Sequence, residues 1–190
     1  MDAFIRRFWR DRLVTIPGHE VVGVDTDSVR FLERTGLPLN CDSVSEILGV
    51  SYLEFLTYDR LKQVEIESQR YLVFTESYGM GFGLCVFDSS VRLVDLDERS
   101  VIEYAAKNTR SFMYILTRMT ESVSSFRSSS KFSPEHDANY WKGLIEIYSN
   151  TKQMILLDAV ESEESWFFDF ANIQISECQN NIDLLKIDEY

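Results

Sequence analysis

The feature that most constrains this chain is a series of three short apolar segments separated by turns. Residues 70–77 are rich in β-branched and aromatic side chains, and residues 82–88 and 91–97 follow as two further apolar segments. A glycine-rich turn separates the first two, and an Asp-Ser-Ser turn separates the last two. Apolar segments bounded by Gly, Asp and Ser are typical of antiparallel strands joined by tight turns. The pattern therefore predicts an antiparallel meander.

The residues that follow the meander repeat their apolar side chains at three- and four-residue spacing from Ser100 onward. This spacing places the apolar residues on one face of a helix, so we expect a long amphipathic helix that begins at Ser100. A helix on an antiparallel sheet gives an α+β fold. We predict a curved mixed or antiparallel sheet of about five to six strands covered by helices, with C-terminal helices completing the core. The apolar face of the expected helix contains Val101, Tyr104, Ala105, Phe112, Ile115, Leu116 and Met119.

The chain before the meander predicts mostly helices. Residues 1–13 form a basic helix with aromatic residues on one side, which is compatible with a membrane-surface or nucleic-acid arm and better explained as a docking helix that packs on the domain. Residues 28–35 form a second helix, capped by Asp25 or Asp27 and ended by Gly36. A helical turn is expected within residues 42–49, and strands are expected at residues 52–57 and 62–67.

The chain after the meander predicts two more helices. Residues 123–134 are rich in serine and are expected to form a surface loop. Within residues 135–180 we expect a helix at residues 139–157, a break at residues 158–162 and a last helix that opens at Glu163 or Glu164, followed by a frayed tail. All these elements are interpreted as one domain spanning residues 1–190.

Charge is the strongest signal in the composition. The net charge is −12, and residues 135–190 contain twelve acidic residues against three lysines. Such a surface disfavours nucleic acid, whose binding depends on Lys and Arg contacts to phosphates, and it favours a basic partner. The simpler interpretation, that acidity keeps the protein soluble, stays open.

The sequence contains no signal for a membrane or for a disulfide framework. No apolar segment approaches the roughly 20 residues that span a bilayer, and the N-terminal segment lacks an apolar core of signal-peptide length. We therefore expect a cytoplasmic protein without membrane contact. The three cysteines are odd in number and far apart, and Cys85 is expected to be a small buried residue of a strand.

No motif points to an enzyme, a metal or a cofactor. The glycines at positions 79, 81 and 83 alternate and lead into a strand, so they indicate a turn rather than a phosphate-binding loop. His19 and His136 lie in no metal-binding or hydrolase pattern. The acidic residues Asp95, Asp97 and Glu98 are compatible with acid–base chemistry or a divalent cation, and are better explained as the cap of a strand-to-helix turn. Together these observations favour a binding protein.

Several landmarks resemble a known family in their order along the chain. Residues 31–38 end a helix with Gly-Leu-Pro, and residues 107–116 place small polar residues before an aromatic and leucine core. Between them lie the hairpin segments Tyr-Leu-Val-Phe, Leu-Cys-Val-Phe-Asp and Val-Arg-Leu-Val-Asp, and residues 156–166 place an Asp after an apolar helix and before a Trp-bearing helix. This order resembles the SUKH superfamily, and within it the fourth group of bacterial toxin-immunity proteins. In the hairpin, where the family often has Gly-Asp, this chain has Ser-Tyr-Gly-Met-Gly.

The resemblance implies an α+β immunity protein, not an enzyme, that neutralises a co-encoded polymorphic toxin by direct binding. Such toxins are often nucleases or nucleic-acid deaminases with basic surfaces. We hypothesise that an acidic face blocks the substrate cleft of the toxin, while the oligomeric state stays open. A regulatory or scaffold protein of the same fold is the main alternative, and a small enzyme that uses Asp95 and Asp97 is another. The residues predicted to bind the partner are Asp88, Asp95, Asp97 and Glu98 near the sheet edge, with Glu161, Glu163 and Glu164 as a second patch.

Overall fold

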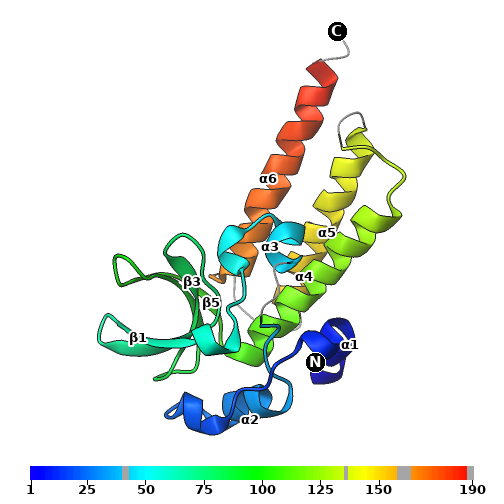
Figure 1. Cartoon of the computed structure of the whole chain (residues 1–190). Helices are drawn as coiled ribbons and strands as arrows, with labels where there is room; N and C mark the ends of the chain where they lie inside the picture. The colour runs from blue at the N-terminus through cyan, green and yellow to red at the C-terminus, as the bar shows by residue number, and fades with distance from the viewer. Residues whose placement is uncertain (40–42, 135–136, 158–163, 188–190) are drawn as a thin grey trace. The chain divides into compact units, whose positions relative to one another are not determined.

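The computed structural model describes residues 1–39, 43–134, 137–157 and 164–187 (Figure 1). The chain forms two compact units, Met1–Thr117 and Arg118–Tyr190, and the border between them falls inside a helix. The described residues contain one five-stranded sheet and six α-helices, which confirms the predicted α+β class. The single domain over residues 1–190 stays a prediction, and each unit is described by itself.

The first unit contains the whole sheet, and its strands follow one another in the order of the chain. All neighbouring strands are antiparallel, so the predicted meander is confirmed and the sheet is not mixed. The strand predicted at residues 52–57 is wrong, because Ser51–Leu53 form a 3₁₀ helix and only Phe55 bridges to Thr75. The five strands are β1 Lys62–Ile66, β2 Gln69–Val73, β3 Met80–Cys85, β4 Val91–Asp95 and β5 Ser100–Ala106.

The helix predicted to begin at Ser100 is wrong, since residues 100–106 form β5 and pair with β4. Val101 and Tyr104 fit a helical spacing, but β-branched and aromatic residues also favour a strand, and pairing with β4 decides the outcome. The helix α4, Thr109–Ser129, begins only after Asn108. The Asn108 side chain accepts a hydrogen bond from the Ser111 N–H at 2.9 Å, as an N-cap residue does.

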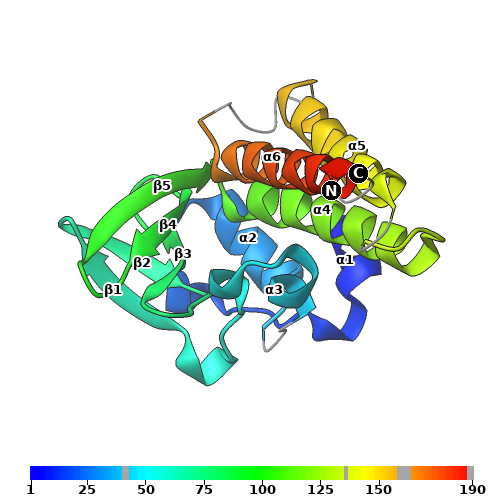
Figure 2. The ribbon, with the colours of Figure 1, turned by 90° about the horizontal axis from the view of Figure 1, so that it is seen from above.

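The sheet curls, so its two edge strands approach each other (Figure 2). A Glu67 carboxylate oxygen, just after β1, accepts a hydrogen bond from the Val101 N–H of β5 at 3.1 Å. In a flat five-stranded sheet the edge strands are roughly 19 Å apart, which no glutamate side chain can span. The hydrogen bond therefore requires a strongly curved sheet.

Each face of the curved sheet covers its own apolar cluster. On the outer face, the Phe82 ring of β3 and the Phe74 ring after β2 lie 5.0 and 5.5 Å from the Phe112 ring of α4. Because both faces are buried at the centre of the sheet, β3 is buried over nearly its whole length, whereas the edge strand β1 alternates between exposed and covered residues. The inner face buries Leu56, Ile66, Tyr71, Val73, Cys85 and Val94, with Val64, Leu96 and Val101 packed against them.

Two glycines of β3 face the inside of the curl. A Cβ atom at Gly81 would overlap the backbone carbonyl oxygen of Thr75, and a Cβ at Gly83 would lie 3.2 Å from the Cβ of Tyr71. The chain after β2 thus passes directly over Gly81, and the Tyr71 side chain packs over Gly83. These close approaches explain why β3 has glycine at positions 81 and 83; a turn alone would not require glycine there.

The N-terminal segments pack within the first unit. Helix α1, Asp2–Trp9, buries Ile5 and Trp9, and the indole N–H of Trp9 donates to the Thr117 hydroxyl at 2.7 Å. On the same helix, the Phe4 ring lies 5.9 Å from the Tyr114 ring of α4. Its aromatic side is therefore buried against its own unit, while most of its arginines are exposed.

Helices α2, Thr26–Arg34, and α3, Ser43–Leu48, follow. The predicted cap is confirmed for Asp25, whose carboxylate accepts from the N–H groups of Asp27 and Ser28 at 2.8 and 3.1 Å. Gly36 follows the helix with a φ of 80°, as its predicted role as a C-terminal cap requires.

The second unit contains the end of α4 and the helices α5, Ala138–Leu157, and α6, Trp166–Ile187. The serine-rich loop predicted at residues 123–134 is partly wrong, because α4 continues to Ser129. Buried Val123 and half-buried Phe126 anchor this serine-rich end of α4, and the Ser129 hydroxyl donates to the Ser125 carbonyl at 2.7 Å. The frayed tail predicted after Asn180 is also wrong as far as Ile187, whereas the break predicted at residues 158–162 lies outside the described residues.

Aromatic side chains join the three helices of the second unit. The Phe126 ring of α4 lies 5.5 Å from the Tyr140 ring of α5 and packs against Gly143. The Tyr148 ring of α5 lies 6.0 Å from the Phe170 ring of α6. In the part of the chain that the structure describes, no helix is both long enough and apolar enough to cross a membrane.

We expect Gly81→Ala to destabilise the first unit strongly and Gly83→Ala to have little effect. The alanine methyl at position 81 meets immobile backbone, so we expect a loss of about 3 kcal/mol, at the upper end for an overpacked site. At position 83 the methyl group needs only a small shift of Tyr71, and alanine favours a strand more than glycine, so the change is within about 1 kcal/mol. Urea denaturation of both variants measures the difference; equal losses would contradict the close approach at Gly81.

Candidate partner-binding surface

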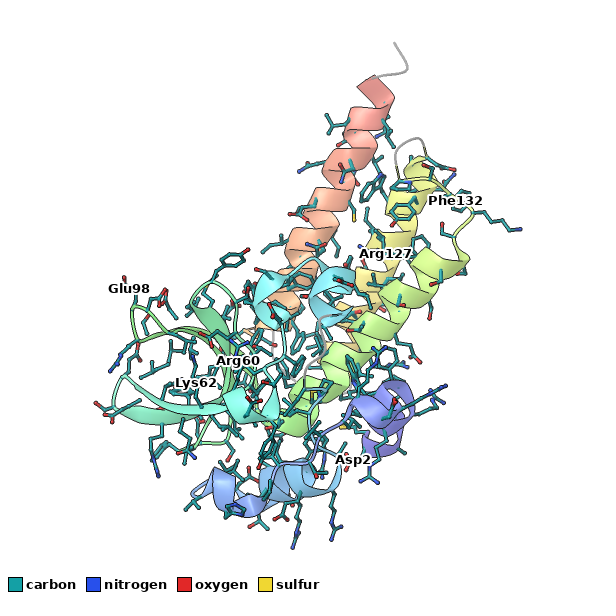
Figure 3. All side chains as sticks on the ribbon, viewed as in Figure 1. Asp2, Arg60, Lys62, Glu98, Arg127 and Phe132 are labelled. Carbon is teal, nitrogen blue, oxygen red and sulfur yellow. The ribbon has the colours of Figure 1, made fainter. Side chains whose placement is uncertain are left out.

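Three acidic side chains lie in one short turn between β4 and β5, and we call Asp95, Asp97 and Glu98 the acidic turn. Asp95 ends β4, and one of its carboxylate oxygens accepts hydrogen bonds from the N–H groups of Asp97 and Glu98 at 2.9 and 2.8 Å. The cap predicted here for a helix is wrong, because the turn leads into β5; Asp95 instead bonds the N–H groups of the turn itself. Asp97 and Glu98 are exposed, and Glu98 lies near the tip of the turn (Figure 3).

The acidic turn is held against the loop between β2 and β3. The Leu96 N–H donates to the Gly79 carbonyl at 2.7 Å. A Cβ atom at Gly79 would overlap the Asp97 carboxylate, and Gly79 has a φ of 76°. The positive φ favours glycine here, and a side chain would displace the Asp97 carboxylate from its present position. The turn is therefore ordered before any partner binds, which lowers the entropic cost of association.

An exposed aromatic residue extends from the same loop. Tyr78 precedes Gly79 and is 88% exposed, with a left-handed φ of 51°. A tyrosine at this position contributes nothing to the core, yet tyrosine is enriched among the residues that dominate binding at protein interfaces. The residues predicted from the sequence do not include Tyr78. The signal that could have found it is a large aromatic residue immediately before a glycine at a hairpin tip.

Asp88 lies away from the acidic turn, at the other end of β4. It belongs to the turn between β3 and β4, and the length of β4 separates it from Asp95 by roughly 13 Å or more. Its carboxylate forms an ion pair with the Arg92 guanidinium at 2.6 Å. The Ser90 N–H and hydroxyl donate to its other oxygen at 2.9 and 2.6 Å. The structure thus gives Asp88 partners within its own chain, and its role in partner binding stays a prediction.

The second predicted patch is only partly described. Glu161 and Glu163 lie outside the described residues. Glu164 is exposed at the turn that precedes α6, in the second unit. Its place in a binding surface stays a prediction.

The described residues do not form a metal-binding cluster. No group of three or more His, Cys, Asp or Glu side chains among them is arranged to hold an ion. His19 lies in the short helix Gly18–Val21, and His136 falls outside the described ranges. Cys85 is fully buried, as predicted, and its thiol donates to the Gln69 amide oxygen at 3.2 Å.

Comparison with known proteins identifies no relative. A scan against protein-family models matches no family, and searches of curated proteins and of solved structures find no match.

The stability of the first unit should depend on pH through Asp88, because the pKa of this carboxyl is lowered in the folded state. Burial raises this pKa, but the hydrogen bonds from Ser90 and the charge of Arg92 outweigh burial, so the pKa lies below its ordinary value of 3.8. Because the folded-state pKa is lowered, the contribution of Asp88 to stability is fully present above the unfolded-state pKa. It is lost as the pH falls through the folded-state pKa, below about 3.8.

We therefore expect Asp88→Asn to cost about 1 kcal/mol at neutral pH, and we expect this cost to disappear below the folded-state pKa. Urea midpoints of the variant and the natural protein, measured from pH 7 down to pH 2, provide the comparison. Asp11→Asn, at an exposed site near the N-terminus, is the matched control. A cost for Asp88→Asn that does not change with pH would show that the ion pair stabilises nothing.

Proposed function

We propose that this protein is a cytoplasmic immunity protein that binds and neutralises a cognate toxin with a basic surface. The observation that carries this proposal is the acidic turn: two exposed carboxylates on a preordered hairpin, beside the exposed Tyr78, in a chain with a net charge of −12. The resemblance of the sequence to the SUKH superfamily supports the same conclusion.

The electrostatic support follows from what such a toxin must do. An enzyme that acts on nucleic acid contacts phosphates through Lys and Arg, so its substrate cleft is basic. An acidic partner is attracted to that cleft over a distance, which accelerates the encounter. Bound there, its carboxylates occupy the positions of the substrate phosphates.

The order of the acidic turn supports binding rather than solubility alone. Charges that serve solubility need no fixed positions, whereas Asp97 lies against Gly79 and Asp95 bonds two backbone N–H groups of the turn. Preorganised charges lose less entropy on binding than flexible ones do. Tyr78 adds a large contact area at the same end of the sheet.

A variant that removes charge and keeps hydrogen bonding tests the acidic turn. The triple substitution Asp95→Asn, Asp97→Asn and Glu98→Gln removes three charges. Asparagine at the first of these positions still has a side-chain oxygen that accepts the two N–H bonds that Asp95 accepts, so the turn should keep its structure.

The matched control is Glu146→Gln, Asp169→Asn and Glu177→Gln, which removes three exposed charges from α5 and α6. The toxin probe is the C-terminal domain of the toxin that the proposal expects the adjacent gene to encode.

We expect the natural protein to rescue cells that express this toxin domain. The acidic-turn variant should bind roughly 30-fold more weakly at low salt, because each exposed charge contact contributes up to about 1 kcal/mol, and the difference should shrink as salt rises. The control should lose far less. Equal losses in both variants would reject the acidic turn as the contact, and a natural protein that binds without protecting cells would favour the regulatory or scaffold function.

A further inference from the structure

A groove follows β1, and its other side is formed by Leu96 and Arg99, which are neighbours of the acidic turn in the chain. Its volume is about 290 Å³, and all five residues of β1 line it together with Leu96 and Arg99. Figure 3 shows Lys62, the first residue of β1, and Glu98 of the acidic turn on the same curved sheet. The volume is at the lower limit of small-molecule pockets, but the groove extends over the length of a whole strand. Its shape therefore suits an extended chain better than a compact ligand.

The edge of β1 offers backbone groups to such a chain. In the described sheet β1 pairs only with β2, and the hairpin between them has a two-residue loop, Glu67 and Ser68, with φ values of 50° and 65°. Such a loop makes the flanking residues Ile66 and Gln69 a hydrogen-bonded pair, and these pairs alternate along an antiparallel ladder. The N–H and C=O groups of Glu65 are consequently directed away from β2, toward the groove.

The two walls of the groove are held in place. The hydrogen bond between Glu67 and the Val101 N–H joins the end of the β1 hairpin to the start of β5. Val64 of β1 and Leu96, which lies between Asp95 and Asp97, are partly buried against the inner apolar cluster. The groove thus combines backbone hydrogen-bonding groups with two apolar side chains, as an added strand requires.

The charges around the groove favour a basic binding partner. Glu65 and Glu67 belong to the β1 hairpin, and Asp97 and Glu98 to the acidic turn, and all four are exposed. The lining also contains two cations: Lys62, which forms an ion pair with Glu76 at 2.6 Å, and the exposed Arg99, which offsets one of the four carboxylates. The surroundings of the groove are therefore net negative and complementary to a basic segment.

We propose that an extended, Lys- or Arg-bearing segment of the partner protein adds to β1 as a sixth strand, in the groove between β1 and the acidic turn. This inference rests on the proposed function, since it assigns how the toxin is held. The added strand forms backbone hydrogen bonds with Glu65, and its cationic side chains lie near the acidic turn.

The substitution Glu65→Pro tests the inference directly. Proline removes the N–H that the added strand would use, and it is tolerated at a strand position whose N–H points outward, so the β1–β2 ladder remains. Glu65→Gln is the matched control, because it removes the same charge and keeps the N–H. Circular dichroism and thermal unfolding verify that both variants fold.

The first probe is the toxin domain encoded by the adjacent gene. We expect Glu65→Pro to raise its Kd at least about tenfold, the equivalent of one lost backbone hydrogen bond or more, and Glu65→Gln to raise it less than about threefold. Equal Kd values for Glu65→Pro and the natural protein would overturn the sixth strand and leave the immunity function standing. A different result would reject the immunity function itself: a natural protein that neither binds the toxin domain nor protects cells that express it.

The second probe leaves the protein unchanged. It is a peptide of about seven residues that alternates Lys and Val, compared with the same peptide methylated at alternate backbone nitrogens. Binding of the unmethylated peptide should slow hydrogen exchange of the Glu65 amide at least about tenfold, and the methylated peptide should not do so. Protection that maps to other residues would overturn the inference. Protection of Glu65 that grows with protein concentration in the absence of peptide would also overturn it, because a second copy of the chain would then occupy the edge.

Discussion

The curl of the sheet depends on two positions of β3 that have no side chain. At Gly81 the chain after β2 passes so close that any Cβ atom would overlap the Thr75 carbonyl, and at Gly83 the Tyr71 side chain occupies the space above the strand. A side chain at position 81 would hold the two backbone segments apart and flatten the sheet, whereas position 83 tolerates a methyl group and excludes only larger side chains. A flat five-stranded meander would leave its inner face open to solvent, whereas the curved one buries Tyr71, Val73, Cys85 and Val94.

The same curl creates the candidate binding surface. It brings the β1 hairpin to β5, where Glu67 bonds the Val101 N–H, and it places Leu96 and Arg99 opposite β1. The acidic turn and the strand edge thus become two walls of one groove, although residues 67–94 separate them in the sequence. The curl that buries the inner apolar cluster, and so stabilises the fold, therefore also determines the geometry of the groove.

The sequence predicts the elements whose signals are local. The meander and the cap at Asp25 follow from short-range patterns, and the structure confirms both. The predicted start of the helix at Ser100 is wrong, because the apolar residues Val101 and Tyr104 are compatible with a helix as well as with a strand. Asn108, whose side chain caps α4, marks the true start of the helix.

Features that depend on contacts between distant segments could not be predicted in this way. The alternating glycines indicate a turn in the sequence, and only the position of Thr75 and Tyr71 reveals that they permit a curl. Asp88 and Asp95 are close in the sequence, which suggests one patch, but β4 places them at opposite ends of the sheet. The aromatic-glycine pair at Tyr78 marks a hairpin tip, but it does not distinguish a contact residue from a turn residue.

The acidic turn and the strand edge have different roles in recognition, because they differ in range. Charge attraction acts over a Debye length of about 8 Å at physiological salt and mainly accelerates encounter, whereas backbone pairing acts only on contact and slows dissociation. Backbone bonds alone discriminate poorly between sequences. Specificity must come from the side chains beside them, where Glu65 faces outward and Val64 faces the inner cluster. A strand beside β1 alternates in the same way, so the segment that fits best has a basic residue opposite Glu65 and an apolar residue opposite Val64.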